Sequence, residues 1–347
     1  MKKGCAVMLL AWTVATVAYW WLLRPTATGW PLLWAIVLGL TVMVLLGTLF
    51  GLGMSLKRAA ALKRKPNEWK DGEFVGAAGW LSAVRDALVA PLSGQPALLF
   101  QFEVKRVVQR KTGKGSATQT ERFVLGMAMQ ACEVRGAWSS TRLIGYPLLA
   151  EFKAEAAPDS GGAARLARWL LAHPPQAMGG GIAERLARMA AVHADPDGEL
   201  LEVFGDAQGP FVDAYAAACV VRERDGEQAA VAQLVGWFQD NGCALTEKRV
   251  APNAEVCAFG EWDAATRRLD IGSGMQHLSR DLLPGSASVV AARIVRRGVT
   301  GLLVWLLIAA SLHLLVWELS GRPWWGAAVT PPAAPAERPA EAPELPR

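Results

Sequence analysis

Few residues in this 347-residue sequence have the types and spacing that chemistry requires. The run KTGKGSATQT at 111–120 contains Gly-Lys-Gly-Ser, but a P-loop needs G-x-x-x-x-G-K-[ST] between a strand and a helix, and the context here is a hairpin. Three glycines at 179–181 fit a flexible helix entry better than an anion site. Asp195, Asp197 and Glu199 imitate part of a calcium loop without its bidentate glutamate. We therefore expect no cofactor and no catalytic residue from these motifs.

Histidine and cysteine indicate equally little chemistry in the soluble part. His173 and His193 lie at the ends of predicted helices, where an imidazole suits the helix dipole, and neither has a Cys or Ser partner. The cysteines after the first apolar block are widely spaced and lack any C-x-x-C pair: Cys132, Cys219, Cys243 and Cys257. This spacing favours reduced side chains in a core over disulfides or a zinc site.

The elements that must position any site are partly transmembrane. The chain is 52% hydrophobic and only 19% charged, and its apolar residues gather in three blocks at 4–23, 32–56 and 298–317. Each block reaches the ~20 residues needed to cross a bilayer. We expect a transmembrane hairpin over 1–56 and a third helix at 298–317. A cleaved signal peptide is the alternative for the first block, although its apolar run is long for one.

His313 is the only ionisable residue within the third block. An ionisable side chain in a spanning helix often faces protein or water and marks a function. The alternative is a neutral ring that reaches toward the membrane interface, because His313 lies in the outer third of the block. Both interpretations stay open on the sequence alone.

Basic residues at the ends of the blocks predict the orientation. Lys2 and Lys3 precede the first block, and a basic linker at 57–70 follows the second. The N-terminus and the soluble part are then cytoplasmic, in what we expect to be a bacterial inner membrane, and the Pro/Ala-rich, disordered tail at 327–347 lies outside. The linker also attracts anionic lipid headgroups, so membrane lipid is an expected partner through these residues: Lys57, Arg58, Lys63, Arg64 and Lys65. No aromatic–basic reader motif accompanies them, and we expect no nucleic acid partner.

The soluble part, at 71–292, has a mixed pattern that predicts an α+β domain. Strands are predicted at 73–81, 97–109, 122–132, 244–250, 255–262 and 266–271, and helices at 163–172, 182–193 and 227–240. The fold class is therefore a multi-pass membrane protein whose strand-rich soluble domain carries inserted helices, with a helical insertion at 153–195.

A Pro/Gly turn is formed by Ala90, Pro91, Ser93, Gly94 and Pro96, and a second segment contains Glu247, Val256 and Gly260. The turn and this second segment resemble the opening and the closing strands of the GIDE domain. The domain occurs in organellar membrane E3 ubiquitin ligases and in bacterial relatives. The resemblance implies a strand–turn–strand opening, with the turn at the surface and Leu98, Phe100, Phe102 and Val104 mostly buried.

The ligase activity of that family resides in a RING finger, which needs eight closely spaced Cys and His ligands for zinc. No cysteine follows Cys257, so we expect neither structural zinc nor ubiquitin transfer. The expected function is a membrane-anchored, non-enzymatic interaction or scaffold module that presents the domain to a protein partner, in envelope stress or maintenance. The alternative is a membrane enzyme of unrecognised type, or an E3-ligase-family homologue by descent without its RING.

Overall fold

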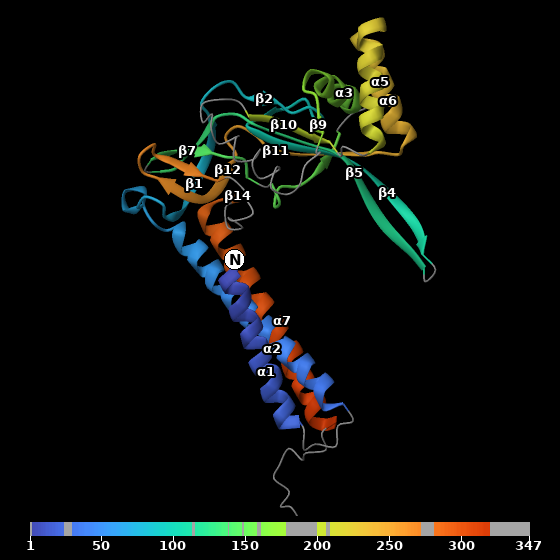
Figure 1. Cartoon of the computed structure of the whole chain (residues 1–347). Coiled ribbons are helices and arrows are strands. Elements are labelled where there is room, and N and C mark those ends of the chain that lie inside the picture. The colour runs from blue at the N-terminus through green and yellow to red at the C-terminus, as the bar shows by residue number, and fades with distance from the viewer. Residues whose placement is uncertain are drawn as a thin grey trace, which may run out of the picture. The chain divides into compact units, whose positions relative to one another are not determined.

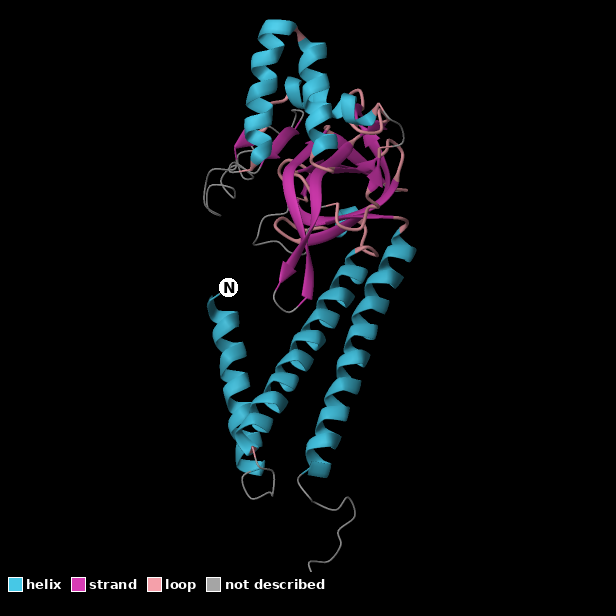
Figure 2. Cartoon of the chain, turned by 90° about the vertical axis from the view of Figure 1, so that its right-hand side faces the viewer, coloured by secondary structure: helices cyan, strands magenta, loops and turns pink. Residues whose placement is uncertain are grey.

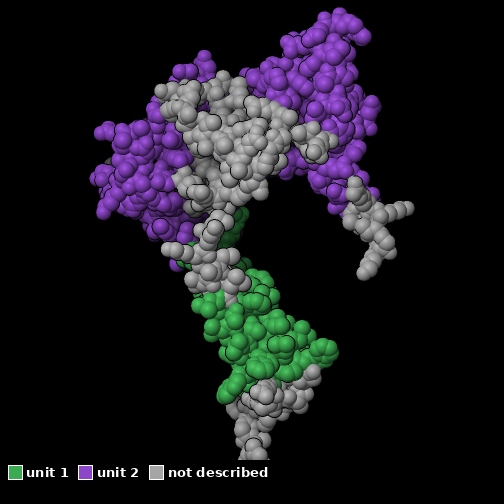
Figure 3. Space-filling view, in the orientation of Figure 1, with its two compact units in different colours: residues 1–53, 297–347 green, residues 54–296 purple. Residues whose placement is uncertain are grey.

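The structure of the chain is a computed structural model that describes residues 2–23, 30–112, 115–137, 139–147, 149–157, 161–177, 200–205, 209–271 and 281–319 (Figure 1). The chain forms two compact units, residues 1–53 with 297–347 and residues 54–296, which are green and purple in Figure 3. Helices make up the described part of the first unit, and all described strands belong to the second. The protein is therefore a mixed α/β chain with a strand-rich domain.

The first unit contains three apolar helical segments, from α1 (Lys2–Leu23), α2 (Pro31–Ala61) and α7 (Ala287–Leu319). Of these, α2 and α7 are long and apolar enough to cross a membrane, and α1 contributes a shorter apolar segment, Leu10–Leu23. Two of the three predicted spans thus meet the requirement of length and composition. A membrane-spanning α1 stays a prediction.

The three helices of the first unit meet in a small buried cluster. Leu23 of α1, Leu38 of α2 and Val316 of α7 form it. A Cβ at Gly39 would lie 2.4 Å from Oγ1 of Thr16, so the missing side chain lets α1 and α2 approach closely.

The second unit contains a closed barrel of five strands. Its strands, in hydrogen-bonded order, are β1 (Phe74–Ala83), β6 (Cys132–Arg135), β7 (Ser140–Ile144), β13 (Arg268–Asp270) and β12 (Glu255–Asp263), and β12 pairs back to β1. The pairing of β13 with β7 is parallel and the other pairings in the ring are antiparallel. A sixth strand, β14 (Asp281–Pro284), adds to β12. Leu81, Val256 and Leu269 are fully buried in the core cluster of this barrel.

A second, open sheet of six strands belongs to the same unit. Its order is β8 (Glu155–Ala156), β11 (Ala244–Val250), β4 (Leu99–Thr112), β5 (Gly115–Met129), β10 (Leu200–Gly205) and β9 (Gln176–Ala177). The helices α3 (Gly162–Ala172), α5 (Pro210–Asp225) and α6 (Glu227–Asp240) gather on one side of it (Figures 1 and 2).

Strand β4 of the open sheet is buried on one face, whereas Gln101, Glu103 and Lys105 on its other face are half-buried. Phe100, Phe102 and Val104 belong to the cluster that includes the helices, whereas Leu98 and Leu99 belong to the barrel cluster. Leu99 and Phe100 point to opposite faces, so the start of β4 contributes to both cores, and Leu98 immediately precedes the strand. The expectation that Leu98, Phe100, Phe102 and Val104 are buried is confirmed, because each is 0% exposed.

The hairpin of β4 and β5 continues past the open sheet as a two-stranded arm, residues 106–121 (Figure 1). The last partner of β11 on β4 is Lys105, and the last partner of β10 on β5 is Val124. The predicted hairpin is confirmed, but its strands are longer than the predicted 97–109 and 122–132, because strand pairing continues to Thr112 and Gly115. Thr118, Gln119 and Thr120 are exposed, which suits a ribbon that is solvated.

The structure describes two of the three predicted helices and adds one that was not predicted. Those at 163–172 and 227–240 are confirmed as α3 and α6, and the one at 182–193 lies outside the described residues. Helix α5 was not predicted, because its apolar residues form no single stripe; its signals are Pro210 at the start and Gly226 after the end. Strands predicted at 244–250, 255–262 and 266–271 are confirmed as β11, β12 and the shorter β13.

Candidate functional site

Two arginines of the basic linker after α2 form ion pairs within the second unit. Arg58 forms an ion pair with Asp281 at 2.8 Å, and its guanidinium lies 4.6 Å from the centroid of the Phe259 ring. Burial raises the pKa of the Asp281 carboxyl above its ordinary value, although Arg58 opposes the shift. Arg64 forms an ion pair with Glu73. Both arginines thus support the folded unit.

The other three predicted headgroup residues, Lys57, Lys63 and Lys65, are exposed. Lys57 lies on α2, whereas Lys63 and Lys65 lie between α2 and the short helix η1 (Pro66–Glu68). Lys63 has no ion pair within the part of the chain that the structure describes. Lys57 therefore belongs to α2, whereas Lys63 and Lys65 belong to the segment that follows this helix.

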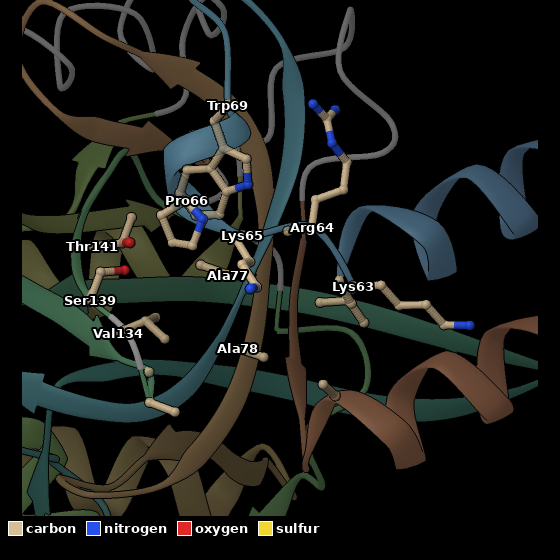
Figure 4. A pocket seen from close by; sticks show the side chains of 15 residues that line it. Lys63, Arg64, Lys65, Pro66, Trp69, Ala77, Ala78, Val134, Ser139 and Thr141 are labelled. Carbon is tan, nitrogen blue, oxygen red and sulfur yellow. The ribbon is translucent and has the colours of Figure 1, made fainter.

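Lys63, Arg64 and Lys65 line a pocket of about 270 Å³, which we call the basic pocket. Its other lining residues come from the start of the soluble unit, from β1, from β6 and β7 with the turn between them, and from α7: Leu62, Pro66, Trp69, Gly76, Ala77, Ala78, Val134, Gly136, Ala137, Ser139, Thr141 and Ala287. Figure 4 shows the hydroxyls of Ser139 and Thr141 on one wall, facing Pro66 and Lys65, while Arg64 and Lys63 extend away from them. Hydroxyl, indole and ammonium donors therefore share one cavity.

Trp69 is the most informative residue of the basic pocket. Its side chain is only 8% exposed and packs edge-to-face against Trp262, with ring centroids 5.0 Å apart. The buried indole Nε1 has no hydrogen-bond partner among the described residues. A buried donor without an acceptor is costly and rare in native proteins, so an acceptor from outside the chain fits this position.

A second hollow of about 560 Å³ lies against Trp262, and we call it the acidic hollow. Its charged lining residues are Asp71, Glu261, Asp263 and Asp270. Oδ1 of Asp71 accepts a hydrogen bond from the backbone N–H of Ala264 at 2.9 Å, and the Asp263 carboxylate accepts from residues 265 and 266. Within the described ranges, no three His, Cys, Asp or Glu side chains are grouped to hold a metal ion.

The turn predicted at residues 90–96 lies between two short paired strands, β2 (Leu88–Val89) and β3 (Pro96–Ala97). Gly94 adopts a positive φ of 68°, which glycine allows without strain, and it is exposed together with Pro96. Ala90 and Pro91 are buried, so only the second half of the turn lies at the surface.

Glu247 joins this turn to the open sheet. Its carboxylate is 4% exposed and accepts hydrogen bonds from Ser93 Oγ at 2.6 Å and from the backbone N–H of Leu92 at 2.8 Å. The structure thus brings Ser93 and Glu247 together although 154 positions separate them. Val256 and Gly260 lie elsewhere, on the barrel strand β12, where a Cβ at Gly260 would lie 2.2 Å from the carbonyl oxygen of Asp270.

His313 makes two hydrogen-bonding contacts within the first unit. Nε2 lies 2.6 Å from the hydroxyl oxygen of Tyr19, and Nδ1 lies 2.7 Å from the carbonyl oxygen of Ala309. A neutral imidazole with its proton on Nδ1 satisfies both, donating to Ala309 and accepting from Tyr19. Such a contact links α7 to α1 and gives His313 a structural reason to face protein.

The remaining chemical candidates are either engaged or outside the described residues. His173 stacks on Trp169 with ring centroids 4.4 Å apart. Burial raises the pKa of Cys132 and of Cys257 to about 12, so neither thiol ionises near neutral pH. The lysine at 114, the glycines at 179–181, the acidic residues at 195–199, and the histidines at 193 and 277 are not described.

Sequence reasoning missed Trp69, Ser139 and Thr141, which line the basic pocket with the predicted lysines. A tryptophan four residues beyond a lysine-rich run was the only signal, since the two hydroxyls reach the pocket through strand pairing. No protein-family model, no curated protein and no solved structure matches this chain.

Proposed function

We propose that this chain is a membrane-anchored interaction module, without enzymatic activity, that holds a GIDE-like domain at the cytoplasmic face of a bacterial inner membrane. The observation that carries the proposal is the arm, whose outer edges pair with no strand among the described residues. Unpaired strand edges bind a further strand from another chain. A protein partner that adds a strand to the arm is therefore the function that the geometry favours.

The base of the arm is held by charge pairs, which supports a preorganised binding edge. Arg106 of β4 forms an ion pair with Glu121 of β5 at 2.7 Å, and its guanidinium lies 5.5 Å from the Phe123 ring. Lys105 pairs with Glu103 at 2.8 Å beside the register shift between Val104 and Lys105. A preorganised edge loses less conformational entropy when a partner strand binds.

Orientation follows from the positive-inside rule. Lys57, Arg58 and the three following basic residues come after the apolar part of α2, and Arg293, Arg296 and Arg297 precede that of α7. A cytoplasm-active reporter fused after Asp71 should be active, and one fused after Pro331 should report the outer face. A reporter at Asp71 that is active only outside would reverse the orientation.

Site-specific photo-crosslinking in living cells tests the arm. Val107 on the arm and Val220 on α5 are both exposed valines, at 55% and 61%, and they make a matched pair of positions for a photoreactive residue. We expect a discrete crosslinked protein from position 107 and none from position 220. Replacing residues 107–120 by Asn-Gly closes a shorter hairpin and should abolish copurification of that protein. Equal crosslinking at both positions, or copurification without the arm, would refute the arm as the binding edge.

Zinc content separates this proposal from the enzyme alternative. The resembled ligases depend on a zinc-filled RING, whose folding requires the metal. Elemental analysis of the purified chain should find no stoichiometric zinc. Zinc that survives dialysis and disappears when Cys243 and Cys257 are replaced would favour an enzyme.

A further inference from the structure

The basic pocket is tied by chain connectivity to both long apolar helices. Lys63 follows Leu56, the last residue of the apolar run in α2, by seven residues, and α2 itself ends at Ala61. Ala287, which also lines the pocket, is the first residue of α7, and the apolar run at 298–317 begins eleven residues later, about 16 Å along that helix. If α2 and α7 span a membrane, these short chain separations keep residues of the pocket within reach of the lipid headgroups.

The polar side chains of the basic pocket are suited to bind an anion. Three basic residues line it, of which Arg64 is already paired with Glu73, and none of the described residues that line it carries a carboxylate. Ser139 and Thr141 supply hydroxyls, and Trp69 supplies a buried N–H that has no acceptor among the described residues. An indole N–H donates only, and an ammonium group donates only, so the complementary ligand is rich in acceptor oxygens and negatively charged.

The size of the pocket and its apolar side chains narrow the ligand further. About 270 Å³ is just below the roughly 300–1,000 Å³ of pockets that take drug-sized molecules, which suits a single small headgroup. Leu62, Pro66, Ala77 and Ala287 give the pocket an apolar side as well. A phosphodiester with an attached apolar chain matches both sides, whereas free phosphate matches the polar side alone.

We propose that the basic pocket is a binding site for the phosphodiester headgroup of an anionic phospholipid such as phosphatidylglycerol. The phosphate accepts hydrogen bonds from the Trp69 indole and from the hydroxyls of Ser139 and Thr141, and Lys65, which faces those hydroxyls, neutralises its charge. The site rests on membrane anchoring through α2 and α7, but it is independent of the protein partner proposed for the arm. It differs from a diffuse basic flank because it requires a particular cavity.

The test uses the full chain in detergent micelles, labelled with ¹⁵N in its tryptophan indoles and titrated with dihexanoyl phosphatidylglycerol. Trp69→Phe identifies the Trp69 indole signal, which should shift saturably. Lys65→Gln and the double variant Ser139→Ala/Thr141→Val should each weaken binding at least about fivefold. Lys57→Gln is the matched control, because it removes the same charge from the same linker outside the pocket, and it should leave the affinity unchanged.

Two further titrations separate the sources of phosphate. Dihexanoyl phosphatidylcholine, which has no net charge, should bind at least tenfold more weakly, and glycerol 3-phosphate, which has no acyl chain, should also bind more weakly. Equal losses in Lys57→Gln and Lys65→Gln, or an unmoved Trp69 signal, would overturn the site in favour of diffuse attraction. Glycerol 3-phosphate that binds as tightly as the lipid would overturn the lipid as ligand. A failure of the arm crosslinking leaves all of these readouts unaffected.

Discussion

The basic pocket and the acidic hollow lie on the same barrel and differ in what their polar groups do. Trp69 lines the first and Trp262 lines the second, and the two rings are in edge-to-face contact. In the acidic hollow, Asp71 and Asp263 accept hydrogen bonds from the backbone that folds around them. In the basic pocket, the Trp69 indole N–H is buried and has no acceptor in the described chain.

The comparison teaches that charge alone is a poor indicator of a binding site. The four carboxylates are the denser charge cluster, yet the interactions resolved for Asp71 and Asp263 are ones that a turn uses to fix itself. The basic pocket contains a buried donor, the Trp69 N–H, that has no acceptor among the described residues. The unpaired Trp69 N–H is therefore the difference between the two cavities on which the proposal of a ligand site in the basic pocket rests.

Removing the Trp69 side chain should have the largest effect on stability. Trp69→Ala deletes a buried aromatic ring that lines the basic pocket and packs against Trp262, and we expect the free energy of unfolding to fall by about 3–5 kcal/mol. Trp69→Phe keeps most of the ring and removes the unpaired N–H, so it should cost less than half as much. Denaturant titration of the full chain in detergent measures both. Equal losses would show that the N–H, rather than the packed ring, accounts for the contribution of Trp69 to the free energy of unfolding.

A smaller effect is expected on the acidic side. Asp71→Ala removes the acceptor for the Ala264 N–H, and we expect a loss of about 1 kcal/mol in the free energy of unfolding. The exposed neighbour Lys70 provides the control, since Lys70→Ala should change stability by less than about 0.5 kcal/mol. If Asp71→Ala were instead neutral and Lys70→Ala costly, the acidic hollow would not be a structural feature.

The smallest effect is a pH dependence on the acidic side. Hydrogen bonds from Thr266 lower the pKa of Asp263 below its ordinary value of 3.8. Because the folded state binds this proton more weakly than the unfolded state, the stability from Asp263 is present above pH 3.8 and is lost as pH falls through the lowered value. The stability difference between the native chain and Asp263→Asn should therefore be constant near neutral pH and shrink in acid. A difference that grows in acid would contradict the assignment of Asp263 as a hydrogen-bonded carboxylate.

Local sequence patterns predicted individual helices and turns better than they predicted which strands pair with each other. The 3.6-residue spacing of Val231, Leu234 and Phe238 was enough to place α6, and the Pro/Gly content of residues 90–96 was enough to place the turn. The closure of β1 on β12 and the parallel pairing of β7 with β13 join distant segments, and no local pattern encodes them. The barrel could therefore not be predicted from spacing alone.

The candidate site was predictable only in its charge. The sequence identified five basic residues as one flank, whereas the structure assigns Arg58 and Arg64 to ion pairs with Asp281 and Glu73. The partner of Arg58 is 223 positions away in the chain, so its structural role depends on the completed fold. Ser139 and Thr141 reach the pocket for the same reason, through the pairing of β6 with β7.

The pairing of β1 with β12 also determines when this domain can fold during synthesis. Phe74 faces Glu261 across the ladder, and the roughly 190 residues between them take about 10–40 s to translate. Until β12 emerges from the ribosome, β1 has a hydrogen-bonding edge and the apolar side chains of Val75 and Leu81 without their final neighbours. Contacts this distant in sequence also slow folding, because a long loop must close before they form. The nascent chain therefore needs protection from aggregation for most of its synthesis, and truncations before residue 255 should be captured by chaperones rather than fold.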